Sequence, residues 1–264
     1  MKIGGLFFFL SLLVTAPGMA SDLQNPVAPD AAMVEGVGRD GAGWSFSFAP
    51  YFWMAGISGD VAQFHGPLIH IDRSFRDIFA DFDIGGMALA ELRHGRFSLL
   101  GDVIYTKISS SDATPRGIFA RDVEVTSKTF TGFLGAGYAL AEGPAGRLDL
   151  AAGGRVWSVK TEIDIDGGRF DGRSFSDTAT WVDGMVGIRR NYSLTPRASL
   201  MGWAFVGAGG ADLGWDAAAT FGYRINGSLT ALAGYRGLGV DYDRNDFTYD
   251  VVQHGPILGL ALQF

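Results

Sequence analysis

The chain ends in the run GPILGLALQF (255–264), in which large and small side chains alternate. Leu258, Leu260 and Leu262 share one face of an extended strand with Phe264, the last residue, and the small or polar residues between them share the other face. A period of two means that one face of the strand meets an apolar environment and the other does not. The run therefore predicts a strand against lipid or against an apolar core, and a soluble sheet that happens to end in Phe is the alternative.

The first twenty residues have the three parts of an export signal. Lys2 supplies a positive charge, residues 6–14 (LFFFLSLLV) an apolar stretch, and residues 17–20 a small-residue cleavage site, so we expect cleavage after Ala20. The apolar stretch is too short to cross a bilayer as a helix, which takes about 20 residues. An export signal at one end and an alternating strand that closes on Phe264 at the other end indicate export to the outer membrane of a Gram-negative cell. There Phe264 would serve as a C-terminal assembly signal.

Composition divides the mature chain into a tail and one large domain. Residues 21–43 carry two prolines and scattered charges without a sustained apolar period, which predicts a flexible tail. Residues 44–264 have recurring turn signals and no linker long enough to separate two domains. The 39 glycines, 13% aromatic residues and absence of Cys favour curved strands with aromatic anchors over a disulfide scaffold. The formal net charge of -7, with no basic stripe, argues against a nucleic-acid partner.

From Trp44 onward the sequence divides into about ten alternating segments. They span 44–58, 84–94, 96–108, 126–141, 147–160, 178–190, 198–209, 214–225, 228–242 and 248–264. The connections alternate between short, turn-like ones and mostly longer ones, of which 59–83, 109–125 and 161–177 are the longest. This alternation of short and longer connections is typical of an all-β, antiparallel, up-and-down transmembrane β-barrel with an even strand number. Ten strands fit it, and eight strands would require merging two segments into one of roughly thirty residues.

Aromatic spacing gives a second indication of a membrane-spanning barrel. Four strands carry aromatic pairs eight residues apart on one face, which spans roughly 26 Å along a strand and about 20 Å vertically once the strands tilt. This interval matches an apolar band with an aromatic girdle at each rim. The predicted girdle residues are Trp44, Phe52, Phe97, Tyr105, Phe130, Tyr138, Trp215 and Tyr223.

If those aromatics face lipid, charged residues of the opposite parity face the lumen. An arginine facing hydrocarbon at the bilayer midplane would cost about 2–4 kcal/mol, whereas inside the barrel it can pair with an acid. The predicted lumen charge network is Glu91, Asp102, Arg155, Asp183, Asp216 and Arg236, and Asp149, Arg189 and Arg224 have the same inward parity. We interpret it as structural ion pairs that fill a narrow barrel, and ion selection or proton relay is the alternative.

Catalytic and metal-binding patterns are weak. None of the four His residues falls in a Ser-containing motif, and there is no GxSxG. Asp241 begins a run like a calcium loop, but its sixth position is Asp246 instead of Gly and its twelfth is Val252 instead of Glu. We expect no enzyme activity, no metal and no cofactor, with an outer-membrane hydrolase acting on lipid or peptide as the alternative.

One stretch has helical spacing. In residues 74–80 (SFRDIFA) a Ser cap precedes Phe75, Ile78 and Phe79 on one face. This short turn could fold over the barrel mouth as a lid, or it could pack the first long loop, which we favour.

Several segments together resemble Gram-negative outer-membrane β-barrel proteins, a porin-like and largely uncharacterised group. They are APYFWMAGISG (49–59), SFRDIFADFD (74–83), ELRHGRFSLLGDVIYTKIS (91–109), WVDGMVGIR (181–189), GYRGLGVDYD (234–243) and the terminal run. The resemblance implies location and architecture and brings no catalytic residue with it. We expect a monomeric barrel with a largely plugged polar lumen, either a structural or surface-interaction protein or a narrow small-solute pore. Its expected partners are outer-membrane lipid, lipopolysaccharide and the barrel-assembly machinery.

Overall fold

The computed structural model describes residues 43–64, 66–113, 122–166, 172–244 and 246–264. The signal peptide predicted over residues 1–20 lies outside the described residues, as does the tail predicted over 21–43 except for its last residue.

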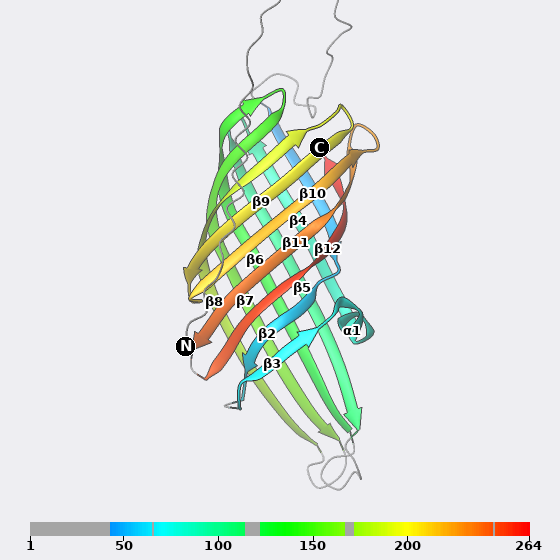
Figure 1. The fold of residues 1–264 in the computed structure, drawn as a ribbon, viewed down its shortest axis with the longest axis vertical. Helices are drawn as coiled ribbons and strands as arrows, with labels where there is room; N and C mark the ends of the chain where they lie inside the picture. Colours follow the sequence, from blue (N-terminus) through cyan, green and yellow to red (C-terminus); the bar gives the residue numbers. More distant parts are fainter. Residues whose placement is uncertain (1–42, 65, 114–121, 167–171, 245) are drawn as a thin grey trace, which may run out of the picture. The chain divides into compact units, whose positions relative to one another are not determined.

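Ten long strands form a closed antiparallel barrel (Figure 1). They are β1 (Trp44–Trp53), β4 (Phe82–His94), β5 (Phe97–Ala113), β6 (Asp122–Gly143), β7 (Gly146–Asp166), β8 (Arg173–Ser193), β9 (Ala198–Gly209), β10 (Leu213–Arg224), β11 (Leu229–Arg244) and β12 (Phe247–Gln263). Each strand pairs with its sequence neighbour, and β1 also pairs with β12, which closes the barrel. The prediction of an all-β antiparallel barrel of ten strands is confirmed.

Backbone hydrogen bonds at the end of the chain complete this closure. Phe264 donates its N–H to the carbonyl oxygen of Phe46 (2.9 Å), and Phe46 donates back to the carbonyl oxygen of Phe264 (3.2 Å). The two rings are stacked with centroids 5.9 Å apart. The last residue is therefore part of the seam between β1 and β12. In the part of the chain that the structure describes, no helix is long and apolar enough to cross a membrane.

The two ends of the barrel differ. At one end, called the turn end, short turns connect β4 to β5, β6 to β7, β8 to β9 and β10 to β11, and β12 finishes there. At the other end, the loop end, β5 to β8 continue well past the predicted strand limits. The predicted loops 109–125 and 161–177 were therefore too long, because β5 reaches Ala113, β6 starts at Asp122, β7 reaches Asp166 and β8 starts at Arg173. In these extensions Ser, Thr, Asp and Glu mostly take the place of the Gly and Ala residues that alternate with apolar residues in the predicted strands.

The first predicted loop, 59–83, also contains ordered structure. β2 (Gly56–Ala62) continues the line of β1 along β12, and β3 (Ile69–Arg73) pairs with β2. Helix α1 (Phe75–Ala80) follows, and Ser74 caps it by accepting from the backbone N–H of Asp77. The ring of Phe75 lies 6.0 Å from the outward-facing Phe52, so α1 packs against the outer wall and does not cover the mouth.

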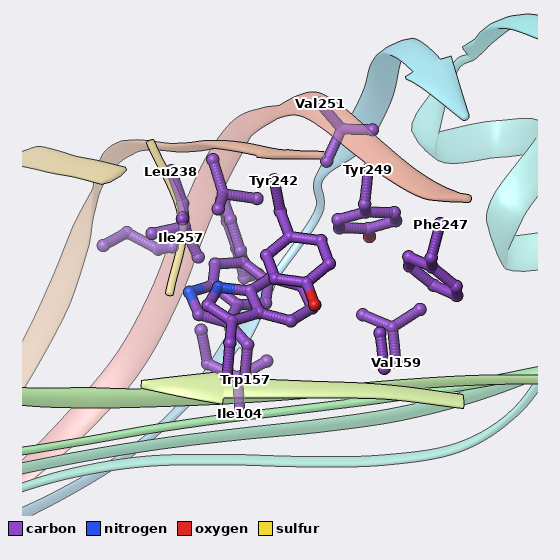
Figure 2. Packing of buried hydrophobic residues seen from close by; sticks show 14 residues of the cluster. Ile104, Trp157, Val159, Leu238, Tyr242, Phe247, Tyr249, Val251 and Ile257 are labelled. Atoms are coloured by element: carbon purple, nitrogen blue, oxygen red, sulfur yellow. The ribbon is translucent and has the colours of Figure 1, made fainter. Parts of the chain in front are cut away.

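The interior of the loop-end half is filled by an aromatic plug: Trp53, Trp157, Trp181, Tyr242, Phe247 and Tyr249, all buried (Figure 2). Trp181 stacks on Tyr242 with centroids 4.1 Å apart and on Trp157 with centroids 5.8 Å apart. Tyr249 meets the edges of both tryptophans at 6.3 Å. Large rings from β7, β8, β11 and β12 thus meet across the lumen and pack it with apolar surface.

Candidate functional site

The aromatic residues predicted for the girdles lie on the outer face of their strands. Along β1 exposure alternates, with Trp44 68% exposed and the inward Trp53 only 4% exposed. Seven of the eight predicted residues are exposed large side chains: Trp44, Phe52, Phe97, Tyr105, Phe130, Tyr138 and Tyr223. The eighth, Trp215, is half-buried because its indole lies flat over Gly239 of β11, where a Cβ would come within 2.1 Å of Nε1.

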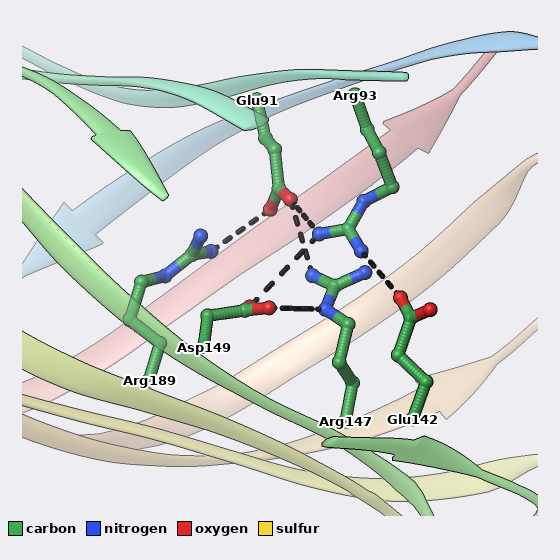
Figure 3. Close-up of polar contacts among 6 residues, drawn as sticks. All are labelled: Glu91, Arg93, Glu142, Arg147, Asp149 and Arg189. Atoms are coloured by element: carbon green, nitrogen blue, oxygen red, sulfur yellow. Dashed lines mark hydrogen bonds and ion pairs between the residues drawn. The ribbon is translucent and has the colours of Figure 1, made fainter. Parts of the chain in front are cut away.

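Charged side chains on the inner face form two separate groups. The first, the arginine cluster, lies toward the turn end and comprises Glu91, Arg93, Arg147, Asp149 and Arg189, with Glu142 at its edge (Figure 3). Glu91 accepts from Arg189 (2.9 Å), from Arg147 (3.2 Å) and from Arg93. Arg147 also pairs with Asp149 at 2.7 Å. All three arginines of the cluster thus donate to the one carboxylate of Glu91.

The second group, the buried network, lies between the arginine cluster and the aromatic plug. Arg236 donates from Nε to Oδ1 of Asp216 (3.0 Å) and from Nη2 to Oδ2 (2.7 Å), and its Nη2 also pairs with Asp102. Arg155 donates to the same Oδ2 of Asp216 at 2.6 Å. Each of these four side chains is nearly inaccessible to solvent, with at most 6% exposure.

Two neutral side chains complete the buried network. The hydroxyl of Tyr51 donates to Asp102 (2.9 Å) and accepts from Arg236 (2.6 Å), and the indole N–H of Trp203 donates to Asp216 (3.0 Å). Every carboxylate oxygen in the group therefore has at least one donor. This satisfies the main condition under which buried ions are tolerated in a protein interior.

Asp183 stands apart from the other predicted lumen charges. It is the register partner of Arg155, yet Arg155 turns to Asp216 and no ion pair joins the two. Its Oδ1 accepts from the backbone N–H of Ala211 (2.8 Å), whereas Oδ2 has no hydrogen-bond partner among the described residues. Asp183 thus holds the backbone of the turn between β9 and β10 by this hydrogen bond. Of the other five predicted residues, Glu91 belongs to the arginine cluster and the remaining four belong to the buried network.

The lumen prediction missed two arginines of the cluster and both neutral partners of the buried network. Arg93 and Arg147 flank predicted turns, where charge is ordinarily solvated, and only the parity that they share with Glu91 and Asp149 could have indicated the lumen. Tyr51 and Trp203 have inward parity too, but an aromatic residue in a strand carries no signal that its polar atom will meet a carboxylate.

A cavity of about 680 Å³ occupies the turn-end half of the lumen. Its wall includes four residues of the arginine cluster (Glu91, Arg93, Arg147 and Arg189) and five of the buried network (Tyr51, Asp102, Arg155, Trp203 and Asp216), but not Arg236. Ser45, Ser47, Thr195 and Phe264 are among the lining residues nearer the turn end. The volume lies within the usual range of small-ligand sites, about 300–1,000 Å³. The inside of the barrel thus consists of an accessible half, lined by charged and apolar side chains, and a half that aromatic side chains fill.

The His residues do not come together. Nδ1 of His70 pairs with Asp60 at 2.7 Å on β2 and β3, and His254 contacts the hydroxyl of Tyr235 at 2.6 Å on the outer face. His94 packs against Trp44 near the turn end, and His65 lies outside the described residues. Within the described ranges, no three His, Cys, Asp or Glu side chains are grouped so that they could hold a metal ion.

Comparisons with known proteins show the fold alone. No protein-family model matches the chain, and no curated protein matches it. Among solved structures it is similar to the outer membrane protease OmpT from Escherichia coli, with 12% identity over 84% of this chain and 97% of that chain and a TM-score of 0.52. It is also similar to the translocator domain of the autotransporter NalP from Neisseria meningitidis, with 15% identity over 88% and 92% and a TM-score of 0.46.

A further match is Ail, the attachment invasion locus protein of Yersinia pestis, with 12% identity over 84% of this chain and 99% of that chain and a TM-score of 0.37. The chain has the fold of Gram-negative outer-membrane β-barrel proteins, as its sequence predicted. A shared fold does not fix an activity, so the activity of this chain has to be argued from its own lumen and surface.

Proposed function

We propose that the protein is an integral outer-membrane barrel that does not conduct solutes and that acts as a structural or surface-interaction protein. The turn end then faces the periplasm and the loop end faces the cell exterior, which is the usual orientation of barrels with short and long connections. The predicted export signal at residues 1–20 and Phe264 at the seam of the barrel support this location.

The aromatic plug is the observation that carries the non-conducting assignment. A solute that crossed the lumen would have to pass both the buried network and the stacked rings of Trp157, Trp181 and Tyr242, all of which are buried. Small barrels leave an interior just wide enough for side chains, and water-filled channels appear at about 16 strands. This barrel has ten strands, and its loop-end half is filled.

The long extension at the loop end supports a surface role. Phe130, a predicted girdle residue, is opposite Ser158, and β7 continues from there to Asp166, about 26 Å further along the strand. This extension carries ion pairs beside the alternating Ile163 and Ile165: Lys128 and Lys160 both pair with Glu162. A paired, polar wall beyond the apolar band provides a rigid surface for contacts outside the membrane.

Conductance of the refolded protein in planar bilayers tests the proposal. We expect no open steps with the wild type. A double variant, W157A/W181A, removes two stacked rings of the plug and should show brief openings, whereas W44A, which changes an outer-face tryptophan, should stay silent. Stable, ion-selective steps with the wild type would refute the non-conducting barrel and favour the narrow pore.

The alternative function is a hydrolase. The exposed pair of His70 and Asp60 is the observation that favours it, because a carboxylate can orient an imidazole as a general base. We propose that the barrel lacks such activity, because no nucleophile-base-acid arrangement joins this pair among the described residues. Assays with phospholipid, lipid A and peptide substrates should show no turnover above that of H70A. Turnover that H70A abolishes, and that H254A leaves intact, would establish the hydrolase instead.

A further inference from the structure

The cavity at the turn end is richer in cations than the rest of the chain. Of the charged residues that line it, six are arginines and three are acids, whereas the whole chain has a formal net charge of -7. The arginines are Arg93, Arg147, Arg155, Arg189, Arg197 and Arg224, and the acids are Glu91, Asp102 and Asp216. Arginine is therefore concentrated on a concave, partly enclosed surface, where solvent screens charge less than it does on an open surface.

Two of these guanidinium groups, those of Arg155 and Arg189, have N–H donors without an acceptor among the described residues. Nη1 of Arg189 is buried without a hydrogen-bond partner, and so are Nε and Nη1 of Arg155, which is 3% exposed. Arg155 gives its one ion pair to Asp216, and Arg189 gives its own to Glu91. A buried N–H of a cation without an acceptor is costly, so the carboxylates around these two arginines compensate their charge only in part.

Two more arginines, Arg197 and Arg224, lie near the turn end. Arg197 lies in the turn between β8 and β9, and the backbone N–H of Arg224 donates to the carbonyl oxygen of Arg197 (2.8 Å), so the two residues are neighbours. Neither side chain forms an ion pair within the described ranges, although both line the cavity. Neither guanidinium is compensated by a carboxylate of a described residue, so an anion bound between the two residues would be attracted by both charges.

Apolar groups line the same cavity. Phe133 and Phe205 pack together with centroids 5.2 Å apart, and Leu100, Met201 and Trp203 lie on the same wall. A wall of this kind favours an organic body over a bare inorganic ion, because burying apolar area contributes roughly 25 cal/mol per Å². Arginines above an apolar wall are the usual composition of a site for an organic acid.

We propose that the turn-end cavity binds a small organic anion, a carboxylate or a phosphate-type group on an apolar body, and that Arg189, Arg197 and Arg224 hold the charged group. The binding goes beyond a structural or surface role, and only the side of entry, the periplasm, rests on the proposed orientation. Arg155 also lines the cavity and adds a further positive charge beside it.

Isothermal titration of the refolded barrel in an uncharged maltoside detergent tests the site, with benzoate and phenylphosphonate as probes. Benzyl alcohol and benzylammonium have the same ring without the negative charge. We expect saturable binding of both anions at one site and at least tenfold weaker binding of the neutral and cationic analogues. Because conductance and anion binding are measured separately, failure of one proposal does not hide failure of the other.

Variants assign the site to the cavity. R197Q/R224Q removes two cations that make no ion pair, so the barrel should fold normally and bind benzoate at least tenfold more weakly. R189Q should weaken binding as well, although its loss of the Glu91 pair makes it the riskier variant. R96Q/R190Q changes two arginines that lie over outer-face tyrosines and should bind like the wild type. Benzoate binding that is absent, that benzyl alcohol matches, or that both double variants lower equally would overturn the proposal.

Discussion

Arg236 holds both carboxylate oxygens of Asp216 in a bidentate ion pair, 3.0 Å from Nε to Oδ1 and 2.7 Å from Nη2 to Oδ2, with both side chains about 1% exposed. The same guanidinium lies 5.5 Å from the ring centroids of Trp53 and Trp203 and 5.9 Å from that of Tyr51. Paired donors and aromatic faces together replace the water that both charges lose.

Breaking this pair should cost far more than breaking an exposed one. In D216N the carboxylate that Arg236 and Arg155 share is gone, so we expect the free energy of unfolding to fall by about 3–5 kcal/mol. D212N is the matched control, because Asp212 pairs with Arg244 at 2.8 Å and is largely exposed, and it should cost about 0–1 kcal/mol. Urea unfolding of the refolded barrels measures both. Equal losses would show that the buried network is not needed for stability.

Gly153 and Gly154 are neighbours on β7 that should respond differently to the same added methyl group. A Cβ on the inward Gly153 would lie 2.3 Å from the carbonyl oxygen of Leu134 and 2.5 Å from Cα of Gly135, so the backbone must move. A Cβ on the outward Gly154 would meet nothing closer than 4.0 Å. We expect G153A to destabilise the barrel by about 1–3 kcal/mol and G154A to stay within about 0.5 kcal/mol, as judged by urea unfolding. A neutral G153A would contradict the close approach of β6 and β7.

The strand number and the direction of most side chains follow from the sequence, because both depend on local alternation. Once Trp215 and Tyr235 are set outward, Asp216 and Arg236 must point inward. The partner of each charge does not follow in this way. Arg236 of β11 meets Asp102 of β5, and such a pair across the lumen depends on the stagger of the whole barrel and not on any single strand.

The ends of the strands were the weakest part of the prediction for a related reason. In residues 107–113 (KISSSDA) polar residues replace the apolar alternation, whereas their backbone pairing with 122–128 continues. In the same way most of β2 and all of β3 lie within the predicted loop 59–83. Neighbouring strand edges there supply hydrogen-bond partners that short sequence patterns do not show.

Glu162 should make the stability of the barrel depend on pH through the loop-end extension. It lies beyond the girdle residue Phe130, and hydrogen bonds from Lys128 and then from Lys160 lower its pKa from 4.5 to about 2. A carboxyl group with a lowered pKa in the folded state stabilises it above the unfolded pKa and loses that effect as protonation sets in. Stability from Glu162 should therefore be complete above about pH 5 and decline between pH 4.5 and pH 2.

E162Q isolates this effect. Lys128 and Lys160 are directly opposite one another in the ladder, so removing the acid between them leaves two like charges in register at every pH. We expect the difference in urea midpoint between wild type and E162Q to be largest at pH 6 and to shrink by pH 3. D164N changes an exposed acid two residues on that forms no ion pair with a described residue, and it should show no such trend. A constant difference between wild type and E162Q would rule out the charge pairing.

Phe264 has two separable roles at the seam, one for its backbone and one for its ring. Its N–H and carbonyl groups both bond to Phe46, and the ring stacks on that of Phe46. Deleting Phe264 removes all three contacts, whereas F264A keeps the backbone bonds and F46A removes the stacking partner without changing the last residue.

If the assembly machinery reads the terminal ring, F264A should lower the amount of folded barrel in the outer membrane of cells and leave refolding in detergent nearly unchanged. Deletion should impair both, because it also opens the hydrogen-bonded seam and exposes a strand edge. F46A should assemble in cells like the wild type if the signal is the ring itself. Gel mobility of unboiled against boiled samples, from cells and from refolding reactions, separates these cases, and equal assembly of F264A and wild type in cells would exclude the ring as a signal.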